Sequence, residues 1–288
     1  MRVKSFAKIN LGLEVLGKRE DGYHEIRTLF QTIDVYDLLE FWPLRQDKII
    51  LMGDDNTISW DERNLIHRAA WLLKEQFNPK GGIRIRVEKN VPAGRGLGGG
   101  SSNAATTLWS LNRIWSLGLE KSALMDLGSH LGADIPYFFE GGLCLGEGIG
   151  DRIIPLDDLS PRLCVLALPS FPLSTAAVYK RVPPSLTSQD KDSKIIKFLD
   201  SRDLGFLEND LEEIVFRTYP QIKAIKNLFQ IKGSELSLMS GSGSAIFGLF
   251  KEKEKAEGVS RELEEKNDVV LTKTLPRESY WADRQTGV

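Results

Sequence analysis

Residues 92–104 read PAGRGLGGGSSNA, and this stretch is the most informative in the chain. Five of its thirteen residues are glycine. Because glycine has no Cβ atom, successive backbone N–H groups can surround an anion, and a helix that follows points its positive end at the same place. The run therefore predicts a loop that binds a polyphosphate.

The segments on either side place this loop between a strand and a helix. Gly82–Glu88 alternates apolar and polar residues, which predicts a strand that leads into the loop. Apolar residues then recur at helical intervals from Ala104 to Trp115, and Gly118 ends the pattern.

The three commonest phosphate loops do not match this run. Gly94, Gly96 and Gly99 have the spacing of a dinucleotide-binding loop, but the acidic residue at the required distance, Glu120, falls between two predicted helices. A P-loop needs a lysine where this chain has Gly100. The companion motifs of a protein-kinase glycine loop do not occur in the sequence. The loop therefore belongs to another class.

The rest of the sequence has an α+β pattern. Alternating or continuous apolar residues predict strands over Val3–Leu16, His24–Val35, Arg162–Leu168 and Asp268–Leu275, a strand and turn over Gly141–Gly150, and two strands with a turn over Leu236–Phe250. Helical spacing predicts helices over Arg63–Phe77, Lys121–Leu131, Leu207–Tyr219, Gln221–Phe229 and Lys251–Lys266. The last dozen residues are expected to form a loose tail. The sequence pattern changes near residues 150–160, with prolines, a polar stretch and helical segments following, so we expect two domains, 1–155 and 156–288.

Composition excludes several classes of function. The chain has 288 residues, with 38 Lys and Arg against 40 Asp and Glu, so a strongly basic surface for nucleic acid is not expected. No apolar run reaches the ~20 residues of a membrane span, and Val3 already reads as structure, which leaves no room for a leader. Cys144 and Cys164 lie in apolar surroundings and are expected to be buried free thiols. We expect a cytoplasmic protein with a small-molecule substrate and no nucleic-acid or membrane partner; its oligomeric state stays open.

Three motifs together resemble one family. Pro92–Ala105 resembles the ATP-binding motif of the GHMP kinases, Ala7–Leu13 resembles their first motif, and Ser240–Ser244 their third. This resemblance implies ATP-dependent phosphorylation of a small alcohol. It also implies an α+β fold with an N-terminal domain like ribosomal protein S5 domain 2, a ferredoxin-like C-terminal domain, and an active site between them.

The N-terminal segment narrows the resemblance to one branch. Ala7–Leu11 followed by Asp21–His24 resembles the branch that phosphorylates the 2-hydroxyl of a cytidine diphosphate-linked methylerythritol in the non-mevalonate route to isoprenoids. Two other hypotheses remain: a GHMP kinase for a homoserine-like or mevalonate-like alcohol, and a nucleotide-binding regulatory protein without turnover. The last would not need a catalytic pair.

The resemblance implies that Asp134 and Lys8 form this pair. Asp134 lies in Gly132–Pro136, where a lone aspartate would ordinarily only shape a turn. Lys8 would lie on the inward face of its strand, where it could keep Asp134 ionised and stabilise a nascent alkoxide. Two roles stay open for Asp134, which could remove the hydroxyl proton fully or mainly orient the hydroxyl.

The resemblance also assigns binding residues. ATP is expected to contact Lys89 and the loop residues Pro92, Ala93, Gly94, Arg95, Gly96, Leu97, Gly98, Gly99, Gly100, Ser101, Ser102 and Asn103. The hydroxyls of Ser101 and Ser102 are expected to bind phosphate or Mg²⁺, although helix N-capping would explain them too. The substrate is expected to contact Asn10, Tyr23, His24, Tyr179, Gly241 and Gly243, with the aromatic rings stacking on cytosine.

One residue departs from the family pattern. Arg95 stands inside the loop where relatives mostly carry a small residue. Its side chain must either point outward or reach phosphate if the loop is to close around a ligand.

Overall fold

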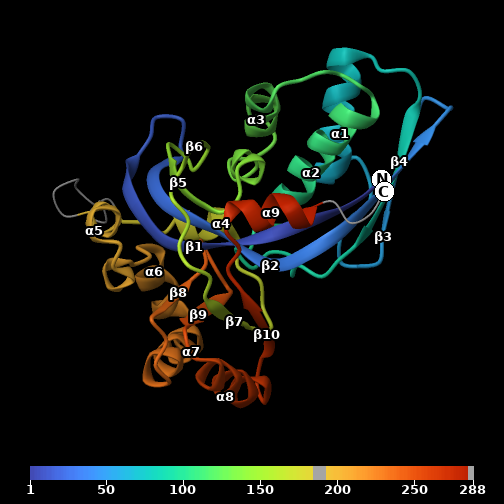
Figure 1. The fold of residues 1–288 in the computed structure, drawn as a ribbon. Coiled ribbons are helices and arrows are strands. Elements are labelled where there is room, and N and C mark those ends of the chain that lie inside the picture. The colour runs from blue at the N-terminus through green and yellow to red at the C-terminus, as the bar shows by residue number, and fades with distance from the viewer. Residues whose placement is uncertain (184–192, 285–288) are drawn as a thin grey trace.

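The computed structural model describes residues 1–183 and 193–284, which form two sheets packed against each other (Figure 1). The first sheet has the order β3-β4-β2-β5-β6, with β1 paired to the other edge of β2. Its strands are β1 (Arg2–Lys18), β2 (His24–Leu44), β3 (Ile49–Gly53), β4 (Gly82–Glu88), β5 (Leu143–Glu147) and β6 (Arg152–Pro155).

The hairpin of β1 and β2 forms the spine of the molecule. Both strands continue beyond their predicted ends, β1 to Lys18 and β2 to Leu44. Along most of β1 the side chains of both faces are buried, because helices cover one face and the second sheet covers the other. Ala7, Ile9 and Leu11 face the second sheet in a shared apolar core, as the alternation predicts. Lys8 and Asn10 consequently lie on the opposite face.

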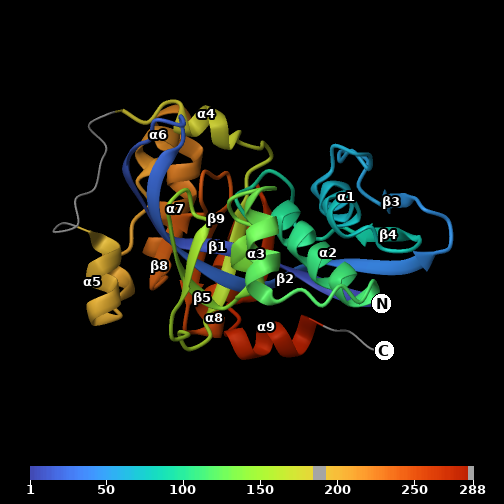
Figure 2. The ribbon, with the colours of Figure 1, turned by 90° about the horizontal axis from the view of Figure 1, so that it is seen from above.

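Three helices cover that opposite face: α1 (Leu65–Phe77), α2 (Gly99–Ile114) and α3 (Lys121–Ser129). Figures 1 and 2 show them on the same side of the β1–β2 hairpin. Helix α2 begins at Gly99, inside the glycine run and five residues before the predicted start, because Gly98 adopts a left-handed conformation (φ +70°) that sets the turn into the helix.

The second sheet has the order β10-β7-β9-β8, and its neighbouring strands are antiparallel. Its strands are β7 (Leu163–Leu168), β8 (Leu236–Met239), β9 (Ile246–Phe250) and β10 (Asp268–Lys273), and its outer face packs on α6 (Leu211–Thr218), α7 (Pro220–Ile231) and α8 (Lys253–Glu264). This βαββαβ arrangement is the expected ferredoxin-like unit. The predicted α+β class is confirmed.

The expected loose tail is wrong for Arg277–Arg284, which form helix α9. The helix packs back on the first sheet, as Figure 2 shows. Tyr280 Oη donates a hydrogen bond to the carbonyl of Phe138 (2.5 Å), and the buried Arg284 donates to the same carbonyl (3.1 Å) and to Thr106 Oγ1 (3.2 Å). The division into 1–155 and 156–288 therefore stays a proposal, since α9 would belong to one part by sequence and to the other by packing.

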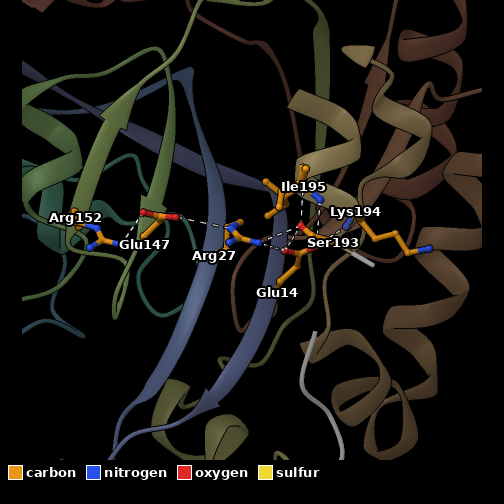
Figure 3. Close-up of polar contacts among 8 residues, drawn as sticks. Glu14, Arg27, Glu147, Arg152, Ser193, Lys194 and Ile195 are labelled. Atoms are coloured by element: carbon orange, nitrogen blue, oxygen red, sulfur yellow. Dashed lines mark hydrogen bonds and ion pairs between the residues drawn. The ribbon is translucent and has the colours of Figure 1, made fainter. Parts of the chain in front are cut away.

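Besides α9, six short elements of the described residues were not predicted. They are β3, η1 (Pro136–Phe139), β6, α4 (Thr175–Tyr179), α5 (Lys194–Ser201) and η3 (Leu204–Phe206). Helix α5 is held by a row of alternating charges (Figure 3). Glu14 of β1 accepts hydrogen bonds from the N–H groups of Lys194 (2.6 Å) and Ile195 (3.1 Å), and Arg27 of β2 lies between Glu14 (3.5 Å) and Glu147 (3.9 Å). Strands β1, β2 and β5 of the first sheet are thus joined to α5 through these charged side chains.

Across residues 1–183 and 193–284, we find no helix with both the length and the apolar character needed to cross a bilayer.

Candidate active site

A cavity of about 1240 Å³ contains most of the predicted site residues. The glycine loop, β1, the β1–β2 turn, the turn before η1, α4 and the β8–β9 turn all contribute to its lining. The predicted residues that line it are Lys8, Asn10, Tyr23, His24, Lys89, Pro92, Ala93, Gly94, Arg95, Gly96, Leu97, Gly98, Gly99, Gly100, Ser101, Asn103, Asp134, Tyr179 and Gly241. Ser102 and Gly243 lie behind this lining.

The glycine loop is shaped by close approach to its neighbours. Gly94, Gly96 and Gly98 have φ values of +68°, +79° and +70°, which L-residues rarely adopt. A Cβ atom on Gly96 would lie 2.1 Å from the carbonyl oxygen of Ser240. Ser240 Oγ donates a hydrogen bond to the Gly96 carbonyl (2.9 Å), so the two glycine-serine loops are in direct contact.

The two serines of the loop lie inside helix α2. Ser101 lines the cavity, whereas Ser102 is buried and its Oγ accepts a hydrogen bond from Ser5 Oγ (2.7 Å). The N-capping alternative is wrong, because the N-cap is Gly98 and no side chain caps this helix. Ser101 is therefore the serine whose hydroxyl is available to a ligand in the cavity.

Lys8 and Asp134 meet on the cavity wall. Lys8 Nζ lies 3.3 Å from Asp134 Oδ2 and donates a hydrogen bond to Asn10 Oδ1 (2.6 Å). The Lys8 side chain is 4% exposed and that of Asp134 35% exposed, so the lysine is buried while the carboxylate faces the cavity. The Lys8 N–H also donates to the Leu97 carbonyl (3.0 Å), which fixes β1 to the glycine loop. The pair therefore lies directly beside the expected position of the phosphates.

A buried aspartate that sequence reasoning missed holds the two ends of the loop. The Asp37 carboxylate is fully buried and accepts hydrogen bonds from the N–H groups of Asn90 and Val91 (2.8 Å each) and from Asn103 Nδ2 (3.0 Å). It also pairs with Lys89 Nζ. The only sequence signal is an aspartate within an apolar strand, and its partners lie more than fifty residues away along the chain.

The predicted substrate residues gather at another part of the cavity. The His24 and Tyr179 rings are 5.4 Å apart, with an angle of 35° between their planes, and Tyr23 is 61% exposed. Burial and then the nearby Lys18 charge lower the pKa of His24, so its ring is neutral at neutral pH. Burial, helped by the charge of Asp134, raises the pKa of Tyr179. These groups present two rings and one neutral imidazole to a ligand.

Asn10 and Gly241 complete that part of the wall. Asn10 Nδ2 donates to Thr28 Oγ1 (2.8 Å), which fixes the orientation of the amide. Gly241 has φ +55°, and a Cβ atom there would lie 3.1 Å from Asn10 Oδ1. The third motif thus reaches the first motif beside Lys8.

Arg95 points out of the glycine loop. Its Nη1 donates hydrogen bonds to the carbonyls of Pro169 and Phe171 and to Ser244 Oγ (3.0 Å). Of the two possibilities open from the sequence, this conformation is the outward one, and it leaves the space above the loop to a ligand.

Sequence analysis also missed the segment before and at the start of α1. Ile58, Trp60, Asn64 and Leu65 line the cavity, and Leu65 Cδ1 would lie 3.7 Å from a Cβ atom on Gly100. Apolar and amide side chains beside a phosphate loop suit the base of a nucleotide. No group of three or more His, Cys, Asp or Glu side chains that could hold a metal gathers within the ranges that the structure describes.

Comparison with known proteins agrees with this geometry. Models of the N-terminal and C-terminal domains of GHMP kinases match residues 64–142 and 196–269. A 4-diphosphocytidyl-2-C-methyl-D-erythritol kinase of Caldicellulosiruptor bescii is 40% identical over 260 residues, which cover 88% of this chain and 90% of the relative. A crystal structure of 4-(cytidine 5′-diphospho)-2C-methyl-D-erythritol kinase is similar, with a TM-score of 0.83, 34% identity and coverage of 95% of this chain and 99% of that one. A homoserine kinase of Cytophaga hutchinsonii has the same fold, with a TM-score of 0.76, 16% identity and coverage of 96% and 94%.

Proposed function

This chain belongs to the GHMP kinases, and from that membership we propose that it transfers the terminal phosphoryl group of ATP to the 2-hydroxyl of 4-diphosphocytidyl-2-C-methyl-D-erythritol. The product would serve the non-mevalonate route to isoprenoid precursors. One observation carries the proposal: the ion pair of Lys8 and Asp134 lies in the same cavity as the glycine loop and the His24–Tyr179 rings.

The chemistry follows from the positions of these groups. Phosphoryl transfer needs a cradle for the phosphates, a cation near the developing charge and an acceptor for the hydroxyl proton. The N–H groups at the start of α2 supply the cradle. Asp134 Oδ accepts the hydrogen bond or proton of the substrate hydroxyl, and Lys8 Nζ, 3.3 Å from Oδ2, places a positive charge beside the reacting oxygen and stabilises the alkoxide.

The donor set of the cavity fits Mg²⁺. This ion commonly binds one or two protein oxygens and takes its other ligands from substrate phosphates and water. The Ser101 hydroxyl and the Asp134 carboxylate both face the cavity, so no larger acidic cluster is required. When bound, Mg²⁺ neutralises charge on the phosphates. Ser101 is the proposed protein contact, because Ser102 is occupied by Ser5.

The substrate side supports a cytidine nucleotide. Two aromatic rings and a neutral imidazole, which both donates and accepts hydrogen bonds, suit a flat base with a polar edge. Homoserine and mevalonate carry no base to occupy these groups. We place the enzyme in the cytoplasm, where ATP is supplied and where the two buried free thiols, Cys144 and Cys164, persist.

A coupled ADP-release assay tests the proposal. The purified chain is given ATP and, separately, 4-diphosphocytidyl-2-C-methyl-D-erythritol, mevalonate and homoserine. We expect turnover with the cytidine compound alone, and calorimetry should detect binding of CDP. Phosphorylation of mevalonate or homoserine without cytidine-nucleotide binding would contradict this proposal and favour a GHMP kinase for a homoserine-like or mevalonate-like alcohol. Nucleotide binding without turnover on any alcohol would favour the nucleotide-binding regulatory protein.

A further inference from the structure

Arg95 links the glycine loop to a segment of the other half of the chain. Its Nη1 reaches the carbonyls of Pro169 and Phe171, and all three of its acceptors, including Ser244 Oγ, are neutral oxygens rather than a carboxylate. Burial lowers the pKa of the Arg95 guanidinium, the charge of Asp268 opposes this shift, and the side chain keeps its charge. The Arg95 guanidinium is thus partly removed from water, although its three hydrogen-bond acceptors are neutral. These hydrogen bonds therefore serve to hold the segment in place rather than to pair opposite charges.

The segment that Arg95 holds leads directly to the substrate side of the cavity. Phe171 precedes α4, which carries Tyr179 to its position beside His24. Ser244 Oγ donates to the same Phe171 carbonyl (2.6 Å), so the loop, the β8–β9 turn and this segment meet at one point. A Cβ atom on Gly94 would lie 3.3 Å from Pro172 Cβ, which shows that the glycine loop also touches the segment directly.

We propose that Arg95 is a positioning residue that couples the nucleotide end of the cavity to its cytidine end, so that each ligand strengthens binding of the other. The identity of the two ligands rests on the function proposed above. A ligand that fixes the glycine loop also fixes the carbonyls that orient α4, and a ligand that fixes Tyr179 fixes the loop. Such coupling is reciprocal, because the binding free energies form a closed cycle. The guanidinium holds its donors in a fixed plane, an arrangement that the rotating ammonium of a lysine does not reproduce.

The test is a calorimetric cycle with ADP and CDP as probes. The dissociation constant of ADP is measured alone and at saturating CDP, and that of CDP alone and at saturating ADP. For the wild type we expect both ratios to be equal and at least about fivefold, the lower range of measured couplings. Arg95→Ala should bring the ratio to about one, and Arg95→Lys should leave it in between.

Ser244→Ala separates positioning from ligand contact. Ser244 holds Arg95 and Phe171 but does not line the cavity, so its loss should lower the ratio without removing a ligand contact. Arg86→Ala is the matched control, because Arg86 is an exposed arginine of β4 and should keep the wild-type ratio. Thermal melts establish that each variant is folded; should Arg95→Ala not fold, Arg95→Lys and Ser244→Ala carry the test.

Two results would overturn the inference. A wild-type ratio of one or less, with both nucleotides bound, excludes the coupling while the proposed function stands. Arg95 would instead be a phosphate ligand if Arg95→Ala weakened a non-hydrolysable ATP analogue more than ADP and left the ratio intact. Failure of the wild type to bind CDP at all would count against the proposed function itself.

Discussion

At the scale of single residues, Lys8 is a charged group buried in the middle of a strand with several partners for its charge. Asp134 Oδ2 lies 3.3 Å from Lys8 Nζ, Asn10 Oδ1 accepts its hydrogen bond (2.6 Å), and the centroid of the Phe30 ring is 5.4 Å from Nζ. A buried ammonium would be costly without such partners. Its place beside a half-exposed carboxylate is therefore best explained by chemistry on a ligand.

Replacement of Asp134 tests this chemistry. Asp134→Asn keeps the shape of the side chain but removes the proton acceptor, so we expect kcat to fall by ~10²–10⁴ while ADP still binds. Steady-state kinetics and calorimetry measure the two effects. Asp126→Asn on α3, an exposed aspartate near the same turn, is the control and should keep wild-type turnover. Near-normal turnover of Asp134→Asn would remove this residue from the mechanism.

His24 predicts a pH dependence of cytidine-nucleotide binding. Burial and then the Lys18 charge lower the pKa of His24 from 6.5, so the midpoint of its protonation lies below pH 6.5. Since protonation would remove its acceptor nitrogen, the affinity for CDP should be highest at pH 7–8 and weaken as the pH falls through that midpoint. Titrations at several pH values measure this, with the exposed His130→Gln as control. A decline that persists in His24→Gln would assign the pH dependence to another group.

At the same scale, the sequence predicts the residues that would contact the ligands better than it predicts the buried residues that hold them in position. Lys8, Asp134 and His24 lie in motifs that resemble those of the family, and Tyr179 lies roughly where the family has a second stacking aromatic; the structure brings all four to one cavity. Asp37 was not found, because its partners are backbone N–H groups and side chains from distant segments. Only the folded chain brings such groups together.

At the scale of elements, contacts with neighbouring segments set the shape of the glycine loop. Gly96 touches the β8–β9 turn, whereas Gly100 lies in the first turn of α2 with room beside it for a Cβ atom. The glycines of this run therefore differ in whether the structure has room for a Cβ atom.

This difference predicts opposite effects of two alanine substitutions. Gly96→Ala places a Cβ atom 2.1 Å from the Ser240 carbonyl oxygen in a left-handed conformation (φ +79°), and should lower the free energy of unfolding by about 2–4 kcal/mol. Gly100→Ala meets only Leu65 Cδ1 at 3.7 Å and should not lower it, since alanine favours a helix by up to about 1 kcal/mol. Urea unfolding compares the two. Equal losses would mean that the contact with Ser240 does not shape the loop.

The elements that the sequence predicted are those with a strong period, such as α1, β4 and α7. Helix α9 was missed because it is short and its sequence is rich in charge. Its stability depends on hydrogen bonds from Tyr280 to the Phe138 carbonyl and from Arg284 to Thr106. The extension of β2 to Leu44 was missed because polarity and burial do not match there: the charged Asp37 is fully buried, whereas the apolar Trp42 is 42% exposed. Tertiary contacts decide both cases.

At the scale of the whole molecule, the two sheets share an apolar core, and a row of charges joins the first sheet to α5 of the C-terminal half. Glu14 is 2% exposed and joins β1 to the start of α5, while Arg27 joins it to Glu147 (Figure 3). The two halves are therefore expected to unfold together.

Substitution of Glu14 measures the contribution of this row. Glu14→Ala removes the acceptor of two α5 N–H groups and the charge facing Arg27, and should lower the free energy of unfolding by about 3–5 kcal/mol. Glu14→Gln keeps one oxygen acceptor and should cost less. Glu25→Ala, which breaks the exposed pair with Arg19, is the control and should cost at most about 1 kcal/mol. Similar losses for Glu14→Ala and Glu25→Ala would contradict the structural role of the row.

The two cysteines offer built-in reporters of how the halves come apart. Cys144 lies in β5 of the first sheet and Cys164 in β7 of the second; burial raises the pKa of Cys144 to about 12 and that of Cys164 even further. Neither sulfur should react with a maleimide while its strand is in place. Because Leu143 and Leu145 beside Cys144 belong to the same core as Cys164, mass spectrometry should find both sulfurs alkylated at one common rate under mild denaturant. Alkylation of one sulfur well before the other would instead reveal two units that unfold separately. The order of alkylation would then show which sheet unfolds first.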